Sequence, residues 1–227
     1  LKACGAARIL SWFAVATILI SSFIAMKQDN LKARLAFSTI GQLSYIILGV
    51  AMMYPFGAVG GLFHIVAHAF MKITLFMCAG AVYVTTGKKN ISEMVGIGRQ
   101  MPVTMACFAI VSVALAGFPP FVGFVSKANL VMGAVAVQSP LYAFTYVASG
   151  LLALAYLMPV VFIAFKRDII NSEFAVKKEA CWPMLVPILV TTSAVILLGL
   201  VPDAGPHLYD LAVSAGQQIF GTLGVGI

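Results

Sequence analysis

The stretch "AVGGLFHIVAHAFMKITLFMCAGAVYVTT" (58–86) is an apolar run longer than the roughly 20 residues that a helix needs to cross a bilayer. It nevertheless contains His64, His68 and Lys72. At about 100° per residue, a step of four advances by only about 40°, so these side chains form one slanting stripe on a helix. An ionisable side chain at mid-membrane costs about 2.5–3.5 kcal/mol. The stripe is therefore predicted to face a neighbouring helix or a cavity, and not lipid.

The whole chain has the composition of an integral membrane protein. Its 227 residues are 62% hydrophobic and 9% charged, with a mean hydropathy of +1.04, whereas soluble domains have about 25% charged residues. Long continuous apolar runs favour helices over the alternating pattern of a β-barrel. We predict an all-α, polytopic transmembrane helix bundle of about seven spans, near residues 9–26, 35–53, 58–86, 103–117, 119–137, 142–165 and 183–201.

The segment "AGFPPFVGFVSK" (116–127) interrupts the apolar sequence without a loop charge before its final lysine. A break at membrane depth leaves backbone groups without partners unless it is buried in protein or lines a wet cavity. Discontinuous helices of this kind mark binding sites in transporters. We expect one discontinuous helix here, with the break formed by Gly117, Pro119, Pro120 and Gly123.

Lys127 stands directly after this break. A lysine removed from water holds its charge less well, so it can gain and lose a proton near neutral pH. Carbonyl groups freed at the break, together with water, could stabilise the charged form. The alternative is an interfacial anchor at the start of a helix.

Lys32 is a weaker candidate, because Asp29 and Arg34 stand beside it as in a solvated loop. The span that follows carries a polar stripe, which could hold water near this lysine and consists of Ser38, Thr39, Gln42, Ser44 and Tyr45.

Carboxylates are missing from the predicted spans. The seven acidic residues fall in loops or the tail: Asp29, Glu93, Asp168, Glu173, Glu179, Asp203 and Asp210. Lysines buried in the spans are then neutral much of the time, or their acidic partner lies on another part of the protein or another subunit. A structural alternative for the stripe is neutral histidines bonded to a serine or a carbonyl group, with a lysine that snorkels.

Several other classes of protein fit the sequence less well. The net charge of +7 comes without a long basic cluster, which argues against nucleic-acid binding. A retinal protein would need an intramembrane carboxylate as counter-ion, and a haem or zinc site would need ligands beyond His64 and His68. A passive structural subunit is a further alternative, and it predicts no cost for replacing Lys72 or Lys127 by leucine.

No cofactor, metal site or catalytic residue is expected. The chain has no nucleotide, iron–sulfur or flavin motif, so redox chemistry is not its own. Its cysteines are scattered without metal spacing and are expected to pack as small apolar residues: Cys4, Cys78, Cys107 and Cys181.

Three segments carry a resemblance to a known family: "DNLKARLAFSTIGQLSYIILG" (29–49), "HIVAHAFMKITLFMCAGAVYVTTGKKNISEMVGIGRQMP" (64–102) and "AGFPPFVGFVSK" (116–127). They resemble the proton-conducting antiporter-like subunits of respiratory complex I, of related membrane-bound hydrogenases and of Mrp-type cation/proton antiporters. The "ISEM" and "GIGRQMP" motifs look most like the D-type branch of the Mrp proteins. The resemblance covers about residues 10–165.

The resemblance implies a fold of inverted repeats, each with one broken helix, and identifies this chain, which opens at Leu1, as the C-terminal half. The implied parts are the end of a preceding helix and a loop (1–34), an antiporter-like five-helix repeat (35–165), and a loop, last transmembrane helix and interfacial tail (166–227). The family's membrane glutamate belongs to the first repeat, which would supply the missing acidic partner.

The resemblance also implies a proton relay. Lys127 matches the lysine of the broken helix, which exchanges protons with the far side of the membrane. The central polar axis of the family is matched by His64, His68 and Lys72. Lys32 matches the lysine of the family's D-x-K-R stretch, although here Ala33 follows it and the next basic residue is Arg34.

As an Mrp-like subunit, the chain would couple proton entry to sodium extrusion. The alternative is a proton-pumping subunit of an NADH:quinone oxidoreductase or a membrane-bound hydrogenase. The expected partners are other membrane subunits, the N-terminal half, the lipid bilayer, protons and Na+, but no nucleic acid. The expected location is the prokaryotic plasma (inner) membrane. Charge gives no orientation, because Lys and Arg divide equally when all seven spans cross.

Overall fold

The computed structural model describes residues 5–166, 178–204 and 207–220. Within these ranges the regular structure is helical, apart from an isolated bridge between Asn30 and Asn90. The elements are α1 (Ala6–Lys27), α2 (Leu31–Ala51), α3 (Pro55–Thr86), η1 (Ile91–Glu93), α4 (Ile97–Gln100), α5 (Pro102–Ala116), α6 (Val122–Ala136), α7 (Pro140–Phe165), α8 (Trp182–Leu200) and α9 (Leu208–Phe220).

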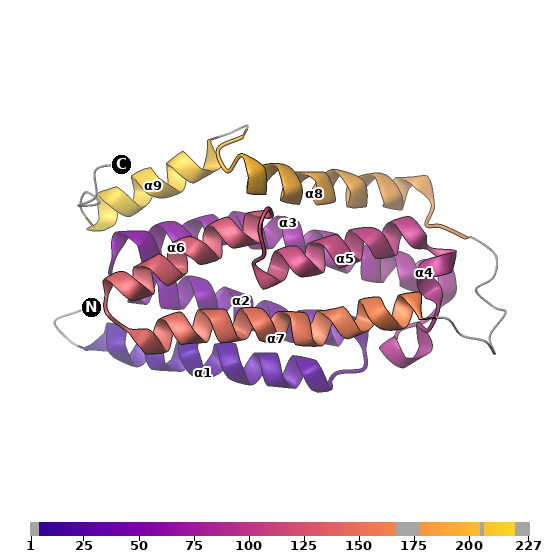
Figure 1. The fold of residues 1–227 in the computed structure, drawn as a ribbon, viewed down its shortest axis with the longest axis horizontal. Helices are drawn as coiled ribbons and strands as arrows, with labels where there is room; N and C mark the ends of the chain where they lie inside the picture. The colour runs from indigo at the N-terminus through magenta and orange to yellow at the C-terminus, as the bar shows by residue number, and fades with distance from the viewer. Residues whose placement is uncertain (1–4, 167–177, 205–206, 221–227) are drawn as a thin grey trace.

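The long helices run along a common axis, so the predicted all-α bundle is confirmed (Figure 1). Five described helices are long and apolar enough to cross a membrane, namely α1, α2, α3, α7 and α8. The shorter helices α5 and α6 lie end to end beside α3 (Figure 1). Together they make the discontinuous helix that the glycine and proline residues predict.

Local chemistry sets the helix ends. Asn30 caps α2, because its side-chain oxygen accepts a hydrogen bond from the Ala33 amide at 3.1 Å. Prolines stand in the first turns of α3, α5 and α7, where their missing N–H is not needed. Gly87 ends α3 in the left-handed conformation that favours glycine, with φ of 74°.

The break between α5 and α6 depends on two glycines. Gly117 ends α5 with φ of 97°, and the Pro119–Pro120 peptide that follows is cis. Gly123 lies in the first turn of α6, where a Cβ atom would collide with the Ala114 carbonyl at the end of α5. The two half-helices therefore meet backbone to backbone across the break.

The tail packs against the bundle. α9 packs along α3, and the Tyr209 ring lies edge-on to the Phe63 ring, with 5.3 Å between the ring centroids. The Tyr209 hydroxyl also donates to Asn129 on α6 at 3.4 Å. An interfacial position for this helix stays a prediction, and the end of the predicted tail, residues 221–227, lies outside the described residues.

Most described basic side chains belong to one end of the bundle, where α1, α3 and α7 end (Figure 1). Because α5 and α6 together make one crossing, the charged loops fall on the same side of the bundle. The expected equal division of Lys and Arg residues between the two sides, which assumed seven crossings, was therefore wrong. The positive-inside rule then sets an orientation by this basic end of the bundle. Its described basic residues are Lys27, Lys32, Arg34, Lys88, Lys89, Arg99, Lys166 and Lys178.

We predict that Gly123→Ala destabilises the protein, because the added methyl group overpacks the junction of the two half-helices, at a typical cost of about 1–3 kcal/mol. Gly80→Ala is the matched control, since a Cβ atom there meets nothing within 4 Å. The melting temperature of the purified protein should fall with Gly123→Ala and stay level or rise with Gly80→Ala. Equal melting temperatures would contradict this account of the junction.

Candidate functional site

Lys72 lies in the interior of the bundle with only 6% of its surface exposed. Its ammonium group donates to the Leu35 carbonyl at 3.1 Å and to the Ser38 hydroxyl at 2.7 Å, both on α2. Ser38 in turn shares a 2.7 Å hydrogen bond with the hydroxyl of Tyr156 on α7. Lys72 therefore does not snorkel, and it is held by neutral oxygen atoms.

His64 lies on the same face of α3 as Lys72 and is fully buried. Its Nδ1 atom is 2.9 Å from the Ser126 hydroxyl on α6, and its Nε2 atom is 3.2 Å from the Gln42 side-chain oxygen on α2. Both ring nitrogens thus have partners, as a buried imidazole requires.

The hydrogen bonds of His64 are compatible with two protonation states. In the neutral ring, Nε2–H donates to Gln42 while the Ser126 hydroxyl donates to Nδ1. In the protonated ring, Nδ1–H donates to Ser126, whose hydroxyl then turns to the Gly123 carbonyl at 3.1 Å. A proton can therefore enter or leave at Nδ1 through rotation of one hydroxyl group.

His68 lies between the other two members of the stripe. Its ring stacks on that of His64, with centroids 5.9 Å apart and planes inclined by 24°. The Nε2 atom of His68 is buried and has no hydrogen-bond partner among the described residues. A buried polar atom of this kind costs about 1–3 kcal/mol unless it is satisfied. A bound water is the usual partner at such a position.

Lys127 is buried at the junction of α5 and α6, with 7% of its surface exposed, so it is not an interfacial anchor. Its ammonium group donates to the carbonyl groups of Leu115 and Ala116 at 2.7 and 3.1 Å. These are carbonyls of the last turn of α5, which the helix itself cannot satisfy. The same ammonium group lies 5.0 Å from the centre of the Tyr45 ring, which stacks on His64 at 5.4 Å.

A cavity of about 320 Å³ borders Lys127. It is lined by residues of α6 and α7 and by the break itself, including Gly117 and Gly150. Part of its wall is made of exposed side chains, among them Phe118 and Leu151. The cavity therefore opens at the surface of the bundle.

Lys32 lies apart from these buried residues. It is exposed near the start of α2, and its ammonium group lies 5.0 Å from the centre of the Tyr83 ring. The polar stripe of α2 does not approach it: Ser38 bonds Lys72, and Gln42 bonds His64. These two polar side chains of α2 therefore lie beside the histidines and the lysine of α3 and not beside Lys32.

Arg34 turns inward where Lys32 turns outward. Its guanidinium group donates to the Tyr156 carbonyl at 2.7 Å and to the Gln28 carbonyl at 2.6 Å. These bonds tie the loop between α1 and α2 to α7.

The buried polar side chains thus form one row across α2, α3, α6 and α7. Each end has a lysine held by oxygen atoms, and the two histidines lie between. No carboxylate of the described residues bonds a member of the row. This row consists of Tyr156, Ser38, Lys72, His68, His64, Gln42, Ser126, Tyr45 and Lys127.

Two members of the row, Ser126 and Tyr156, are not singled out by the sequence pattern. Ser126 immediately precedes Lys127, and its only signal is that it is a polar residue in an apolar helix. Tyr156 lies far away in sequence, so only the packing of α7 on α2 brings it to Ser38.

A second group of titratable residues lies between α8 and α9. His207 Nδ1 is 2.6 Å from the Asp203 carboxylate, and Asp210 is close enough to complete a three-ligand set. The hydrogen bond to Asp203 raises the pKa of exposed His207 and lowers that of Asp203. This ion pair accounts for the closeness of the three side chains without a metal ion.

The helical bundle with its row of buried lysines and histidines defines a polytopic membrane protein with a titratable interior. Comparison with known proteins makes the assignment specific. The chain belongs to the NADH:quinone oxidoreductase/Mrp antiporter transmembrane family, which it matches over residues 3–153. The family resemblance of its sequence motifs is thereby confirmed, and the chain is an integral membrane protein.

Relatives come from both branches of this family. The chain is 35% identical over 204 residues to NADH-quinone oxidoreductase subunit N of Desulforudis audaxviator (strain MP104C), covering 85% of this chain and 41% of the relative. It is 31% identical over 210 residues to a component of a probable K(+)/H(+) antiporter of Rhizobium meliloti (strain 1021), covering 89% and 21%.

A solved structure shares the fold. A chain of the Mrp complex from Dietzia sp. DQ12-45-1b superposes with a TM-score of 0.84 at 24% identity, covering 95% of this chain and 48% of that one. The chain thus spans less than half the length of these relatives.

We predict that Ser126→Ala lowers the stability of the protein by about 1–3 kcal/mol, because the Nδ1 atom of buried His64 loses its partner. Ser112→Ala is the matched control, since this buried serine bonds only the Phe108 carbonyl of its own helix. Thermal unfolding of the purified protein should separate the two variants. A Ser112→Ala effect as large as that of Ser126→Ala would show that the His64 bond is not responsible.

Proposed function

We propose that the row carries protons and that the chain is the C-terminal half of a proton-translocating membrane subunit. The observation that supports this most is the row itself, which brings four titratable side chains from two helices into one buried path. A structural bundle of this composition would fill the same space with apolar side chains, which is often neutral or stabilising.

The proposed path begins at Lys72 and passes to His68 and His64. Histidine exchanges protons in the physiological range, and the two ring planes are stacked one helical turn apart. The step from Lys72 to His68 has no direct hydrogen bond between described atoms, and water bound at the unpartnered His68 Nε2 atom would complete it. The Ser126 hydroxyl then accepts the Nδ1 proton of His64 while it gives its own proton to water on the way to Lys127, and rotation of the hydroxyl restores the starting bond.

Lys127 is the proposed exit. The Tyr45 ring lies between it and His64, so the last transfer uses water along the side of the ring rather than a direct bond. The cavity beside Lys127 opens at the surface of the bundle and supplies a route outward. The α5 carbonyl groups stabilise the ammonium form of Lys127 until the proton is released.

Repulsion between like charges couples the protonation states of the residues in the row. Each added proton raises the electrostatic cost of the next in a medium of low dielectric constant, so a charge arriving at one end favours release at the other. The acidic partner that the described row lacks would lie on the N-terminal half. Lys32 lies outside the row, and a part for it in proton transfer stays a prediction.

The proposed setting is a multisubunit complex in a prokaryotic plasma membrane, with other membrane subunits and Na+ as the counter-transported ion. The alternative is a subunit of an NADH:quinone oxidoreductase, driven by quinone reduction elsewhere. The relatives are compatible with an antiporter and with a redox complex, since one is named for quinone reduction and another for K+/H+ exchange, and neither name specifies Na+.

We expect Lys72→Ala and Lys127→Ala each to abolish ion transport driven by a pH gradient, measured in vesicles that contain the whole complex. Lys72 and Lys127 are the two lysines of the row, and each substitution removes the proton-binding group of one of them. Lys166→Ala is the control, because this lysine is exposed at the end of α7. Co-purification of the other subunits checks assembly. Normal transport by both assembled variants would refute the relay.

The same vesicles decide between the two settings. An antiporter should move protons only when a counter-ion is present, so replacing Na+ and then K+ by choline should stop the pH change. A subunit of a redox complex should be insensitive to this exchange and should instead require electron flow to a quinone. Proton movement without either requirement would contradict both settings.

A further inference from the structure

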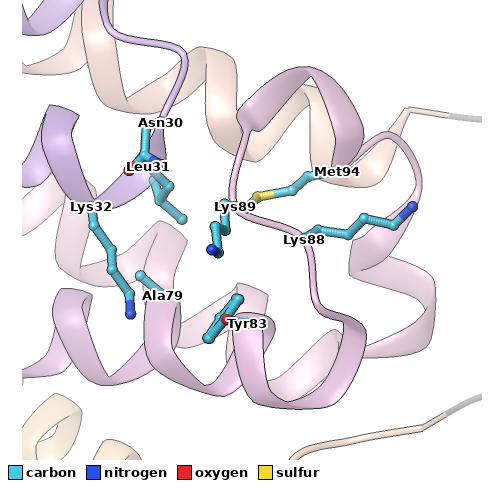
Figure 2. Close-up of a pocket in the computed structure, with 8 residues that line it drawn as sticks. All are labelled: Asn30, Leu31, Lys32, Ala79, Tyr83, Lys88, Lys89 and Met94. Carbon is cyan, nitrogen blue, oxygen red and sulfur yellow. The ribbon is translucent and has the colours of Figure 1, made fainter.

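A cavity of about 310 Å³ lies at the basic end of the bundle, between the start of α2 and the end of α3 (Figure 2). It is separate from the row and is not used in the proposed transport. Its lining combines lysines with apolar side chains and consists of Asn30, Leu31, Lys32, Ala79, Tyr83, Lys88, Lys89 and Met94.

Two ammonium groups converge on one aromatic ring in this cavity. Lys32 and Lys89 lie 5.0 and 5.1 Å from the centre of the Tyr83 ring. Figure 2 shows both side chains directed into the space above the ring, whereas the Lys88 side chain follows the rim and points away. Cation–π contacts with one ring offset only part of the repulsion between two cations.

Nearby carboxylates do not neutralise these lysines. Asp29 accepts from the Ser92 amide and hydroxyl at 3.1 and 2.7 Å. Glu93 accepts from the amides of Lys89 and Asn90, and so caps its own turn. Among the described residues, neither Lys32 nor Lys89 forms an ion pair with a carboxylate, so the cavity has an excess of positive charge.

An apolar stripe leads away from this charge along the outer face of α2. Beyond Lys32, the residues that follow one another at steps of three and four are Ile40, Leu43 and Ile47, with exposed fractions of 47%, 48% and 43%. Steps of this size keep the side chains on one face of a helix. The surface thus presents cations at the membrane boundary and hydrocarbon directly below them.

We propose that this cavity binds the phosphate headgroup of an anionic phospholipid, whose acyl chains lie along the α2 stripe. The two lysines supply the charge, and the floor of Leu31, Ala79 and Met94 receives the apolar part of the headgroup region. The end of the bundle with most basic side chains is the one that the positive-inside rule places against the cytoplasmic leaflet, where anionic lipids attract basic segments.

The test uses the intact complex in phosphatidylcholine vesicles that contain a photoactivatable phosphatidylglycerol. Crosslinks to peptides of residues 31–47 are quantified by mass spectrometry, with a photoactivatable phosphatidylcholine as the neutral comparison. We expect phosphatidylglycerol to label these peptides preferentially. Lys32→Gln and Lys89→Gln should each weaken this labelling about fivefold, which corresponds to about 1 kcal/mol per lysine near an anionic surface.

Lys166→Gln is the matched control, since it removes an exposed lysine at the end of α7, which lies at the same end of the bundle (Figure 1). It should leave the labelling unchanged, and Lys32→Arg with Lys89→Arg should retain it. Equal labelling by both lipids, or labelling indifferent to Lys32 and Lys89, would overturn the proposal.

Two further outcomes would assign the cavity to another occupant and so overturn it. Inorganic phosphate that removes the labelling more effectively than chloride at matched ionic strength would identify a site for free phosphate. Absence of labelling, with Lys32 and Lys89 protected from acylation in the assembled complex, would show that the cavity is covered by a neighbouring subunit. Transport is not measured here, so the result is independent of the proposed relay.

Discussion

The bond between the Lys127 ammonium group and the end of α5 is the interaction on which the site depends. A helix that stops inside an apolar bundle leaves carbonyl groups without partners, which hydrocarbon cannot satisfy. Lys127 satisfies those of Leu115 and Ala116 from the first half of α6. The broken helix and the buried charge thus stabilise one another. The glycines at 117 and 123 let the two half-helices approach closely enough for this bond.

The rest of the row follows a second constraint, which is the lack of carboxylates among its members. Cations buried without an anion must be held by dipoles, and the row uses hydroxyl and carbonyl oxygens from α2, α5, α6 and α7. Such partners favour a positive charge without fixing it, because no opposite full charge must be left behind when the proton moves. A carboxylate in contact with Lys72 would hold its proton more firmly. The weaker partners therefore suit a group that has to release what it binds.

Much of the fold and part of the site could be predicted from the sequence. The spacing of His64, His68 and Lys72 places them on one face of a helix, and the glycine and proline pattern places the break beside Lys127. Pairings between distant segments cannot be read in this way. The hydrogen bond between Ser38 and Tyr156 depends on how α2 and α7 pack. The sequence shows a polar residue in an apolar helix but does not identify the residue that it bonds. Water beside Lys32 stays a prediction, and two residues of the polar stripe, Ser38 and Gln42, turn into the interior instead, where they bond Lys72 and His64.

The two faces of α2 lie in different environments, one at the basic cavity and the other in the interior of the bundle. Lys32 and Arg34 are two residues apart, which is about 200° around a helix, so they must point in opposite directions. Lys32 faces the basic cavity, while Arg34 and Ser38 face the interior. An anion held at Lys32 would be separated from the row by α2, whose Leu35 carbonyl bonds Lys72. Asn30 caps the backbone of α2 and Arg34 bonds it to α7, so the charges on its two faces are held on opposite sides of the helix.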